Sequence, residues 1–290
     1  MVKLSIIILN YNTKDITLKC IESVVSQYKK DLKNAEVELL VADNGSKDGS
    51  AERIKASKFI SFLTLLENEE NLGFTKGNNR AAKYAKGRHL LFLNSDTYIK
   101  DQGFLKITDF LNSNPKVGIV GGKLTNNDGS LQRSAGKFYN LFNIFLMLLG
   151  MERIGFVRSS PSKISRVDWV SGACLMIRRD LFEKLSGFDE NYFMYMEDMD
   201  LCFRAKNRGF LTYFYPDVKL IHIQLGSSNR TFAIKNIYKG LLYFYMKHGN
   251  FLSYSIVKSM IYFKAYLLII IGRIINNKYL VDTYSKALKT

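Results

Sequence analysis

Short aliphatic runs alternate with amphipathic stretches over the first 122 residues, and no other feature restricts the possible folds as much. Buried parallel strands read as such runs, and the helices that connect them carry an amphipathic pattern. The alternation therefore predicts an α/β fold with a mostly parallel central sheet. We expect strands at residues 4–9, 37–42, 62–66, 89–93 and 117–120, and helices at about residues 13–29, 48–56, 75–85 and 102–112.

Polar residues follow three of these predicted strands at the point where each strand ends. In an open α/β sheet, ligands bind beyond the carboxyl ends of the strands, so these residues should meet in one crevice. Neither GxGxxG nor GxxxxGK(S/T) occurs there, which argues against a dinucleotide fingerprint and a P-loop. The three clusters are Asn10-Tyr11-Asn12, Asp43-Asn44-Gly45 and Asn94-Ser95-Asp96.

Two carboxylates in these clusters allow more than one interpretation. Asp96, with Asn94 before it, offers oxygen ligands for a divalent cation completed by substrate phosphates, but it equally suits the cap of the helix near residue 102. Asp43 suits a hydrogen bond to a base or a ribose, with Tyr11 as a stacking face. A plain turn at residues 43–45 explains Asp43 equally well.

A second acidic group, Glu197, Asp198 and Asp200, opens a predicted helix. Acids are favoured in a first helical turn, and a general base needs only one carboxylate beside a crevice. Asp198 and Asp200 are two residues apart and cannot share a helix face, so at most one side of the group serves a site. His222 ends an apolar run and suits either a cation or phosphate site or a structural role.

Composition excludes several classes of protein. With 47% hydrophobic and 23% charged residues, the chain is neither disordered nor collagen-like nor an all-apolar membrane bundle. Cys20, Cys174 and Cys202 show no CxxC spacing, which favours a reducing cytosol over a disulfide framework. The apolar run at residues 4–9 is shorter than a signal-peptide core, so we expect a cytoplasmic location.

The last 65 residues carry much of the formal charge of +16, with ten Lys or Arg and one Asp. Twelve aromatic residues accompany them, a combination that suits an anionic membrane surface. The apolar run at 261–275 falls short of the roughly 20 residues needed to cross a bilayer. We therefore predict a division into residues 1–228 and a helical, membrane-interfacial tail at 229–290. The alternative is a tail that packs on its own domain or forms a homodimer.

Seven blocks of this sequence, taken in order, resemble family 2 glycosyltransferases of the GT-A fold. The closest likeness is to the rhamnosyltransferase-like branch that builds bacterial surface polysaccharides, and it covers about residues 3–250. A further strand-like run is part of it, at residues 167–178. The blocks are residues 5–12 (SIIILNYN), 41–46 (VADNGS), 70–74 (ENLGF) with Asn78, 91–97 (LFLNSDT), 169–178 (WVSGACLMIR), 187–190 (GFDE) and 193–202 (FMYMEDMDLC).

The resemblance implies roles for residues in these blocks. Asp43 is expected to hold the pyrimidine base of a nucleotide sugar, with Tyr11 near the ring. Asp96 matches the last acid of the metal-binding DxD motif, whose first position is Asn94 here, and Asp198 matches the general base. The other matching positions are Asn10, Asn44, Gly73 and Asn78 on the donor side, Trp169 and Gly172 on the sugar or acceptor side, Glu197 beside the base, and His222 with Gly226 and Ser227 near the metal or diphosphate.

The function implied by the resemblance is an inverting transfer that uses Mg²⁺ or Mn²⁺. The donor would be a pyrimidine-diphosphate sugar such as dTDP-rhamnose, and the acceptor a lipid-linked saccharide at the cytoplasmic face of the membrane. A UDP-hexose or UDP-N-acetylhexosamine donor is the alternative within the same fold. A non-catalytic membrane- or nucleic-acid-binding protein is a further alternative, but acids at strand ends do not suit a phosphate backbone, so no nucleic-acid partner is expected.

Overall fold

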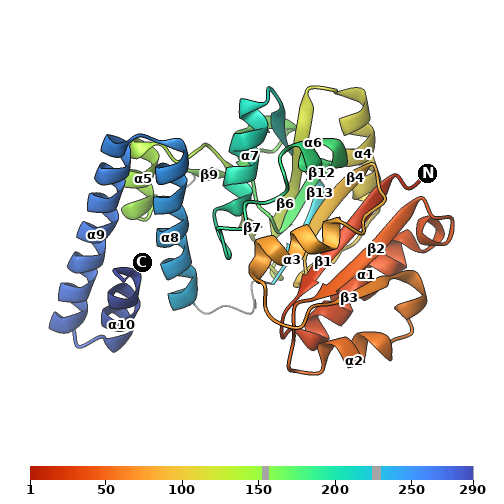
Figure 1. The fold of residues 1–290 in the computed structure, drawn as a ribbon, viewed down its shortest axis with the longest axis horizontal. Helices are drawn as coiled ribbons and strands as arrows, with labels where there is room; N and C mark the ends of the chain where they lie inside the picture. The colour runs from red at the N-terminus through yellow and green to blue at the C-terminus, as the bar shows by residue number, and fades with distance from the viewer. Residues whose placement is uncertain (152–156, 224–229, 290) are drawn as a thin grey trace.

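The computed structural model describes residues 1–151, 157–223 and 230–289. Its central sheet has the strand order β10-β13-β6-β12-β4-β1-β2-β3, with β5 beside β13 and β7 beside β6 (Figure 1). The strands are β1 (Leu4–Asn10), β2 (Val37–Asp43), β3 (Thr64–Glu67), β4 (His89–Asn94), β5 (Thr97–Ile99), β6 (Val117–Thr125), β7 (Leu131–Gln132), β10 (Ser165–Val167), β12 (Cys174–Arg178) and β13 (Leu211–His222).

The predicted α/β sheet is present, but it is mixed and not mostly parallel, because β5, β7, β10 and β12 each pair antiparallel with a neighbouring strand. β1 pairs in parallel with β2 and β4, β2 with β3, and β6 with β13. β12 lies between β4 and β6 and is antiparallel to both. The strand-like run at 167–178 is thus several elements, because the chain turns at Ser171-Gly172 between β11 (Trp169–Val170) and β12.

Helices cover the sheet near the predicted positions, and the core follows from the alternation along the strands. Ile6 and Ile8 of β1 pack into one apolar cluster, and Ile7 packs into the other, because successive side chains of a strand point to opposite faces. The predicted strand at 62–66 begins later than expected, since the segment Ile60–Phe62 forms a 3-10 helix. The helices are α1 (Lys14–Lys33), α2 (Ser50–Lys55), α3 (Gly73–Ala82), α4 (Gly103–Ser113), α6 (Arg179–Lys184) and α7 (Glu197–Asn207).

A small second sheet lies beside the central one. Its strand order is β11-β8-β9, with β8 (Ala135–Gly136) between β11 and β9 (Arg158–Ser159), and both pairings are antiparallel. Gly136 makes this close packing possible, because a Cβ at that position would lie 2.5 Å from the backbone oxygen of Val157. The small sheet therefore brings Arg158 and Trp169 to neighbouring positions.

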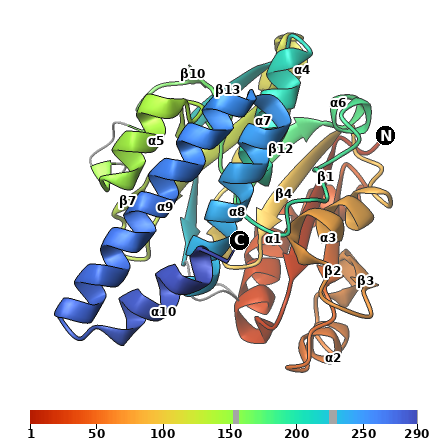
Figure 2. The ribbon, with the colours of Figure 1, turned by 60° about the vertical axis from the view of Figure 1, so that its left-hand side comes forward.

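The tail is helical, as predicted, and it forms a unit with the apolar helix α5 (Leu141–Leu148). α8 (Arg230–His248), α9 (Phe251–Ile274) and α10 (Lys278–Ala287) lie together beside the sheet (Figure 1). Figure 2 shows α5 alongside α9, against which it packs. The Tyr245 hydroxyl donates to the Tyr139 carbonyl at 2.6 Å. The tail thus packs on the preceding part of the chain, and the predicted boundary at 228/229 lies outside the described residues.

The predicted length of the apolar tail helix is wrong. α9 begins at Phe251, ten residues before the expected run, because Asn250 and Ser253 form a capping box that starts the helix there. Its 24 residues are long and apolar enough to cross a membrane, and α9 is the one such helix among the residues described here. Core helices of soluble proteins pass the same test of length and composition.

Candidate functional site

A cavity of about 1620 Å³ opens at the carboxyl ends of β1 and β4, where the sequence predicted a crevice. Its wall continues across β6 and the start of α7 to the tail helices α8, α9 and α10. Most of the predicted site residues line it. These are Tyr11, Asn44, Gly73, Asn94, Asp96, Trp169, Gly172, Glu197, Asp198 and His222.

Asp96 and His222 face each other in this cavity. The antiparallel pairing of β13 with β5 places them there, and His222 Nε2 lies 3.2 Å from an Asp96 carboxylate oxygen. The Asn94 amide lies 3.4 Å from the same ring nitrogen. Helix capping does not account for Asp96, because Asp101 accepts the N–H of Gly103 at the start of α4.

These residues fit a divalent cation that is completed by phosphate oxygens. A carboxylate is a suitable ligand for Mg²⁺ or Mn²⁺, and an imidazole, which is a ligand of transition metals, suits Mn²⁺ better than Mg²⁺. Across residues 1–151, 157–223 and 230–289, no group of three or more His, Cys, Asp or Glu gathers as a metal site. The chain therefore offers a partial ligand set, which is how Mg²⁺ usually meets protein and substrate phosphates. Gly226 and Ser227, predicted near this point, lie outside the described residues.

Asp43 and Asn10 lie behind the cavity wall. Parallel pairing of β1 and β2 sets them opposite each other, and Asn10 Nδ2 donates to Asp43 at 2.5 Å. The other carboxylate oxygen of Asp43 accepts the N–H of Ser46 at 2.9 Å, as a turn residue does. Asp43 is 3% exposed and Asn10 fully buried, and neither lines the cavity.

The remaining residues predicted on the donor side have structural contacts. The Asn44 side chain bonds Asn68, Asn71 and the backbone at residues 72 and 73, so it joins β2 to the start of α3. Gly73 has a φ of +78°, and a Cβ there would meet Phe193 at 2.7 Å. The Asn78 side chain donates to the Phe74 carbonyl inside α3 and does not reach the cavity.

Asp198 reaches the cavity from the first turn of α7. One carboxylate oxygen accepts the Gly172 N–H at 3.0 Å, and the other accepts the Met199 N–H at 2.7 Å. Burial raises the pKa of Asp198, while these N–H groups and the positive charge of Arg158 lower it in part. An elevated pKa moves a carboxylate towards the range in which it accepts a proton effectively.

Glu197 is buried beside this carboxylate. Its Oε2 makes no hydrogen bond to any residue that the structure describes. Burial and the neighbouring charge of Asp198 raise the pKa of Glu197 well above its ordinary value. Two neighbouring carboxyl groups resist ionising together, and the N–H donors to Asp198 favour its ionised form, so the protonated form is favoured at Glu197.

Comparison with known proteins decides the family. Residues 5–186 match the model of the family described as glycosyl transferase family 2. The chain belongs to this family. It is a glycosyltransferase of the rhamnosyltransferase-like kind, as the sequence blocks predicted.

Individual relatives place this family 2 glycosyltransferase more closely. It is 29% identical over 219 residues to the N-acetylglucosaminyl-diphospho-decaprenol L-rhamnosyltransferase of Mycobacterium tuberculosis. The aligned region covers 67% of this chain and 69% of that protein. It is 25% identical over 220 residues to the dTDP-rhamnosyl transferase RfbF of Shigella flexneri, covering 74% and 67%. Both relatives are rhamnosyltransferases by name, in agreement with the predicted branch of the family.

A solved structure confirms the GT-A fold. The mannosyltransferase PcManGT from Pyrobaculum calidifontis, in complex with GDP-Man and Mn²⁺, superposes with a TM-score of 0.58 at 18% sequence identity. The match covers 99% of this chain and 74% of that one, so it extends over the tail as well.

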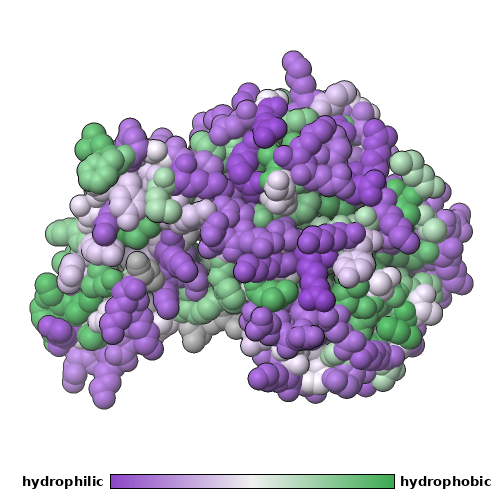
Figure 3. All heavy atoms as spheres, in the orientation of Figure 1, coloured by the Kyte–Doolittle hydropathy of each residue, from purple (hydrophilic) through white to green (hydrophobic). Residues whose placement is uncertain are grey.

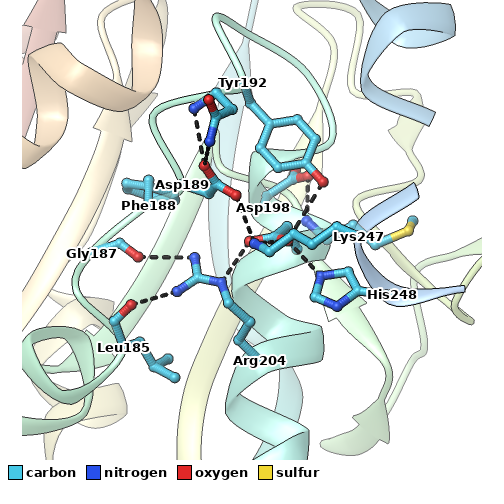
Figure 4. A network of polar contacts seen from close by, with 12 residues as sticks. Leu185, Gly187, Phe188, Asp189, Tyr192, Asp198, Arg204, Lys247 and His248 are labelled. Atoms are coloured by element: carbon cyan, nitrogen blue, oxygen red, sulfur yellow. Dashed lines mark hydrogen bonds and ion pairs between the residues drawn. The ribbon is translucent and has the colours of Figure 1, made fainter. Parts of the chain in front are cut away.

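The face of α7 opposite Asp198 contacts the tail through Asp200. Asp200 is fully buried and accepts bonds from Arg204 at 2.6 Å, His248 at 2.7 Å and Lys247 at 2.8 Å. Figure 4 shows Lys247 and His248 reaching from α8 towards Arg204 of α7. The prediction that Asp198 and Asp200 point in different directions is therefore consistent with the structure, in which Asp198 meets the cavity and Asp200 the tail.

Sequence reasoning did not single out Gln132 or Arg158, which also line the cavity. The Gln132 side chain bonds the His222 ring at 2.8 Å and the His222 carbonyl at 2.6 Å, so it sets the orientation of the imidazole. Both residues lie in two-residue strands outside every recognisable block. Only the three-dimensional pairing of these short strands brings them to the site.

Proposed function

We propose that this glycosyltransferase moves rhamnose from dTDP-rhamnose to a lipid-linked saccharide, with inversion at the anomeric carbon. The observation that supports this most directly is Asp198, a carboxylate of raised pKa on the wall of a cavity that also holds the Asp96–His222 pair. The names of the relatives supply the sugar and the type of acceptor.

Asp198 acts as the general base in this proposal. It takes the proton of an acceptor hydroxyl while the hydroxyl oxygen bonds to the anomeric carbon and the bond to the nucleoside diphosphate breaks. Glu197, which holds its own proton, keeps a second negative charge out of the site. Gly172 orients the base through its N–H, which lies 3.0 Å from the carboxylate.

The donor occupies the end of the cavity formed by the strand termini. Tyr11 provides a ring face for the pyrimidine, and Asp43, fixed by Asn10 and Ser46, supplies a rigid negative end behind it. Asp96 and His222 would hold a divalent cation, Mg²⁺ or Mn²⁺, whose charge offsets that of the departing diphosphate when it is bound. PcManGT was solved with Mn²⁺ and its own nucleotide sugar, which supports a metal in this role.

The tail brings the site to the cytoplasmic face of the membrane in this proposal. α9 leaves Phe251, Leu252, Phe263, Tyr266 and Ile274 more than half exposed. Figure 3 shows apolar side chains on the outer edge of the tail. A helix with such a face, flanked by Lys258, Arg273 and Lys278, matches the composition of interfacial helices.

A transfer assay tests the function. The full-length protein is incubated with Mg²⁺ or Mn²⁺ and with N-acetylglucosaminyl diphosphate on a short polyprenyl chain. dTDP-rhamnose, UDP-glucose and UDP-N-acetylglucosamine are offered in turn, and products are identified by mass spectrometry and NMR. We expect an inverted rhamnosyl product and at least about 100-fold slower transfer in Asp198→Asn, since a general base contributes that much or more. dTDP affinity should not change in this variant.

Three results would contradict parts of the proposal. Transfer from a UDP sugar alone would replace the donor, and retained anomeric configuration would exclude direct displacement. Unchanged turnover in Asp198→Asn would remove this residue from the role of base. Asp180→Asn is the matched control, because Asp180 is an exposed acid of α6 that pairs only with the exposed Lys184 in the contacts given for it.

A further inference from the structure

The wall of the cavity changes character beyond Asp198. On the donor side it includes polar residues at strand ends, whereas on the tail side it carries apolar residues, which are Leu148 and Leu149 at the end of α5 and Ile234 and Ile237 of α8. Four cations line the cavity as well. They come from separate parts of the chain and are Arg133, Arg158, Arg230 and Lys264.

Contacts with two aromatic residues hold Arg158 in place. Its strand, β9, pairs with β8, which in turn pairs with the strand of Trp169. The guanidinium lies 5.6 Å from the centre of the Trp169 ring, and its Nε donates to the Tyr139 hydroxyl at 3.3 Å. These contacts hold the charge on the cavity wall. Its effect on the Asp198 carboxyl shows that it lies within electrostatic range of the base.

The two sides of the cavity differ in how they can hold a phosphate. Around Asp96 a diphosphate would meet a carboxylate, so binding there needs a cation in between. Arg158 carries a positive, planar guanidinium, a group that binds phosphate oxygens directly and bidentately. The cavity therefore offers two anion sites of different chemistry, with Asp198 also on its wall.

We propose that Arg158 binds the diphosphate of the lipid-linked acceptor, and that the first part of the lipid chain lies against the apolar wall formed by the end of α5 and by α8. This inference rests on the proposed function. It places the acceptor sugar beside Trp169, between Arg158 and Asp198.

Exposed apolar side chains on α5 and α9 indicate the path of the lipid chain. Leu149, at the cavity, is 61% exposed, and Phe145 and Phe142 one and two turns earlier in α5 are also half exposed or more. α5 packs against α9, whose outer face is apolar. A chain that leaves the cavity beside Leu149 thus remains in contact with apolar side chains up to the surface assigned to the membrane.

Isothermal titration calorimetry with farnesyl diphosphate tests the site directly, because this soluble probe carries both the diphosphate and an isoprenoid chain. Farnesol lacks the charge, and inorganic pyrophosphate lacks the chain. We expect wild type to bind farnesyl diphosphate at least about tenfold more tightly than either. Arg158→Gln should remove most of the preference over farnesol, and Arg158→Lys should keep part of it because a lysine retains the charge.

Arg166→Gln is the matched control, since Arg166 is an exposed arginine of β10 that does not line the cavity. It should bind farnesyl diphosphate as wild type does. dTDP is titrated into each variant, and unchanged dTDP affinity in Arg158→Gln shows that the fold and the donor side are intact. If dTDP binding is lost in Arg158→Gln, the test uses Arg158→Lys instead. A reduced affinity of Arg158→Lys for farnesyl diphosphate would support the inference, and an unchanged affinity would contradict it.

The inference and the proposed function fail in different ways. Equal affinity for farnesyl diphosphate in wild type and in a folded Arg158 variant would overturn the inference, as would equal affinity of wild type for farnesol. Absence of sugar transfer, with Arg158-dependent binding of the probe intact, would overturn the proposed function alone. Binding of pyrophosphate as strong as that of farnesyl diphosphate would remove the lipid from the assignment.

Discussion

Replacing Asp200 by Asn removes one charge from a buried network and leaves the shape of the side chain almost unchanged. Asp200 is fully buried in the first turn of α7, and its carboxylate meets Arg204, Lys247 and His248 at 2.6 to 2.8 Å. Lys247 and His248 belong to α8, so the network ties the tail to the helix that carries Asp198. The substitution would leave Arg204, Lys247 and His248 facing a neutral amide.

The size of the effect follows from the burial of the partners. Removing one member of a buried ion pair typically costs about 3 to 5 kcal/mol, because the other member stays buried without its counter-charge. Here the two cations, Arg204 and Lys247, are 16% and 26% exposed, so water relieves part of that cost. We expect a loss of about 3 kcal/mol in the free energy of unfolding, which corresponds to a fall in Tm of roughly 5 °C for a chain of this size.

The stability difference between wild type and Asp200→Asn should also depend on pH, in a direction that follows from the pKa of Asp200. Burial alone would raise the pKa of Asp200, but the hydrogen bond from His248 and the charges of Arg204 and Lys247 outweigh it, so the pKa is lowered. A lowered pKa contributes stability above the ordinary value of about 3.9, and this stability is lost as pH falls through the folded value. The difference between wild type and Asp200→Asn should therefore be largest near neutral pH and should shrink below about pH 4.

Urea denaturation at a series of pH values measures both quantities. The control is Asp180→Asn, whose partner Lys184 is mostly exposed, and we expect no measurable change there. In the Lys247→Met background, Asp200→Asn should cost less, because one cation is already absent. A loss below about 1 kcal/mol at pH 7, or an equal loss at pH 3, would refute the assignment of this network as a stabilising link.

Three further outcomes are expected. Asp43→Ala should lower dTDP affinity at least about tenfold in a calorimetric titration. Unchanged affinity would contradict the proposed position of Asp43 behind the pyrimidine. Burial alone would raise the pKa of Asp189, but hydrogen bonds from Lys247 and Asn191 hold it at about 2, so wild type should lose stability between about pH 4 and 2 more steeply than Asp189→Asn. Deleting the chain from Phe251 onward should release the protein from anionic vesicles in a sedimentation assay. Continued sedimentation of the truncated protein would assign membrane binding to another surface.

Much of the sheet could be predicted because its strands are buried on both faces. The run at residues 4–9 has an aliphatic side chain at nearly every position, and the structure places all but one of them out of contact with solvent. The run at 167–178 was expected to be strand-like, but the direction of β12 could not be predicted, because it depends on where the chain turns after β11. That turn places the Gly172 N–H on Asp198, a contact between residues 26 positions apart that no local pattern contains.

The cavity was predictable only where it is made of strand ends. Tyr11, Asn94 and Asp96 follow directly from the rule that polar residues gather at carboxyl ends of parallel strands. Arg158 and Gln132 follow from no such rule, since each lies in a two-residue strand fixed by tertiary pairing. The length of α9 was missed for another reason, because an apolar window starting at Ile261 ignores the capping box at Asn250.

The turn before α7 gives α8 a part in presenting the base. Tyr195 and Met196 both have a backbone φ of +72°. Residues other than glycine rarely adopt this conformation, so the surrounding structure must hold it in place. α8 does this at Gly240, where a Cβ would lie 3.0 Å from the Tyr195 oxygen and from Met196. The same helix supplies Lys247 and His248 to Asp200, on the opposite side of the first turn from Asp198. α8 therefore fixes both the entry to α7 and its first turn, whereas α9 supplies the apolar face. The basic segment after residue 229 thus combines two tasks in the proposed function, since its first helix orients the proposed general base and its second carries the apolar face proposed to meet the membrane.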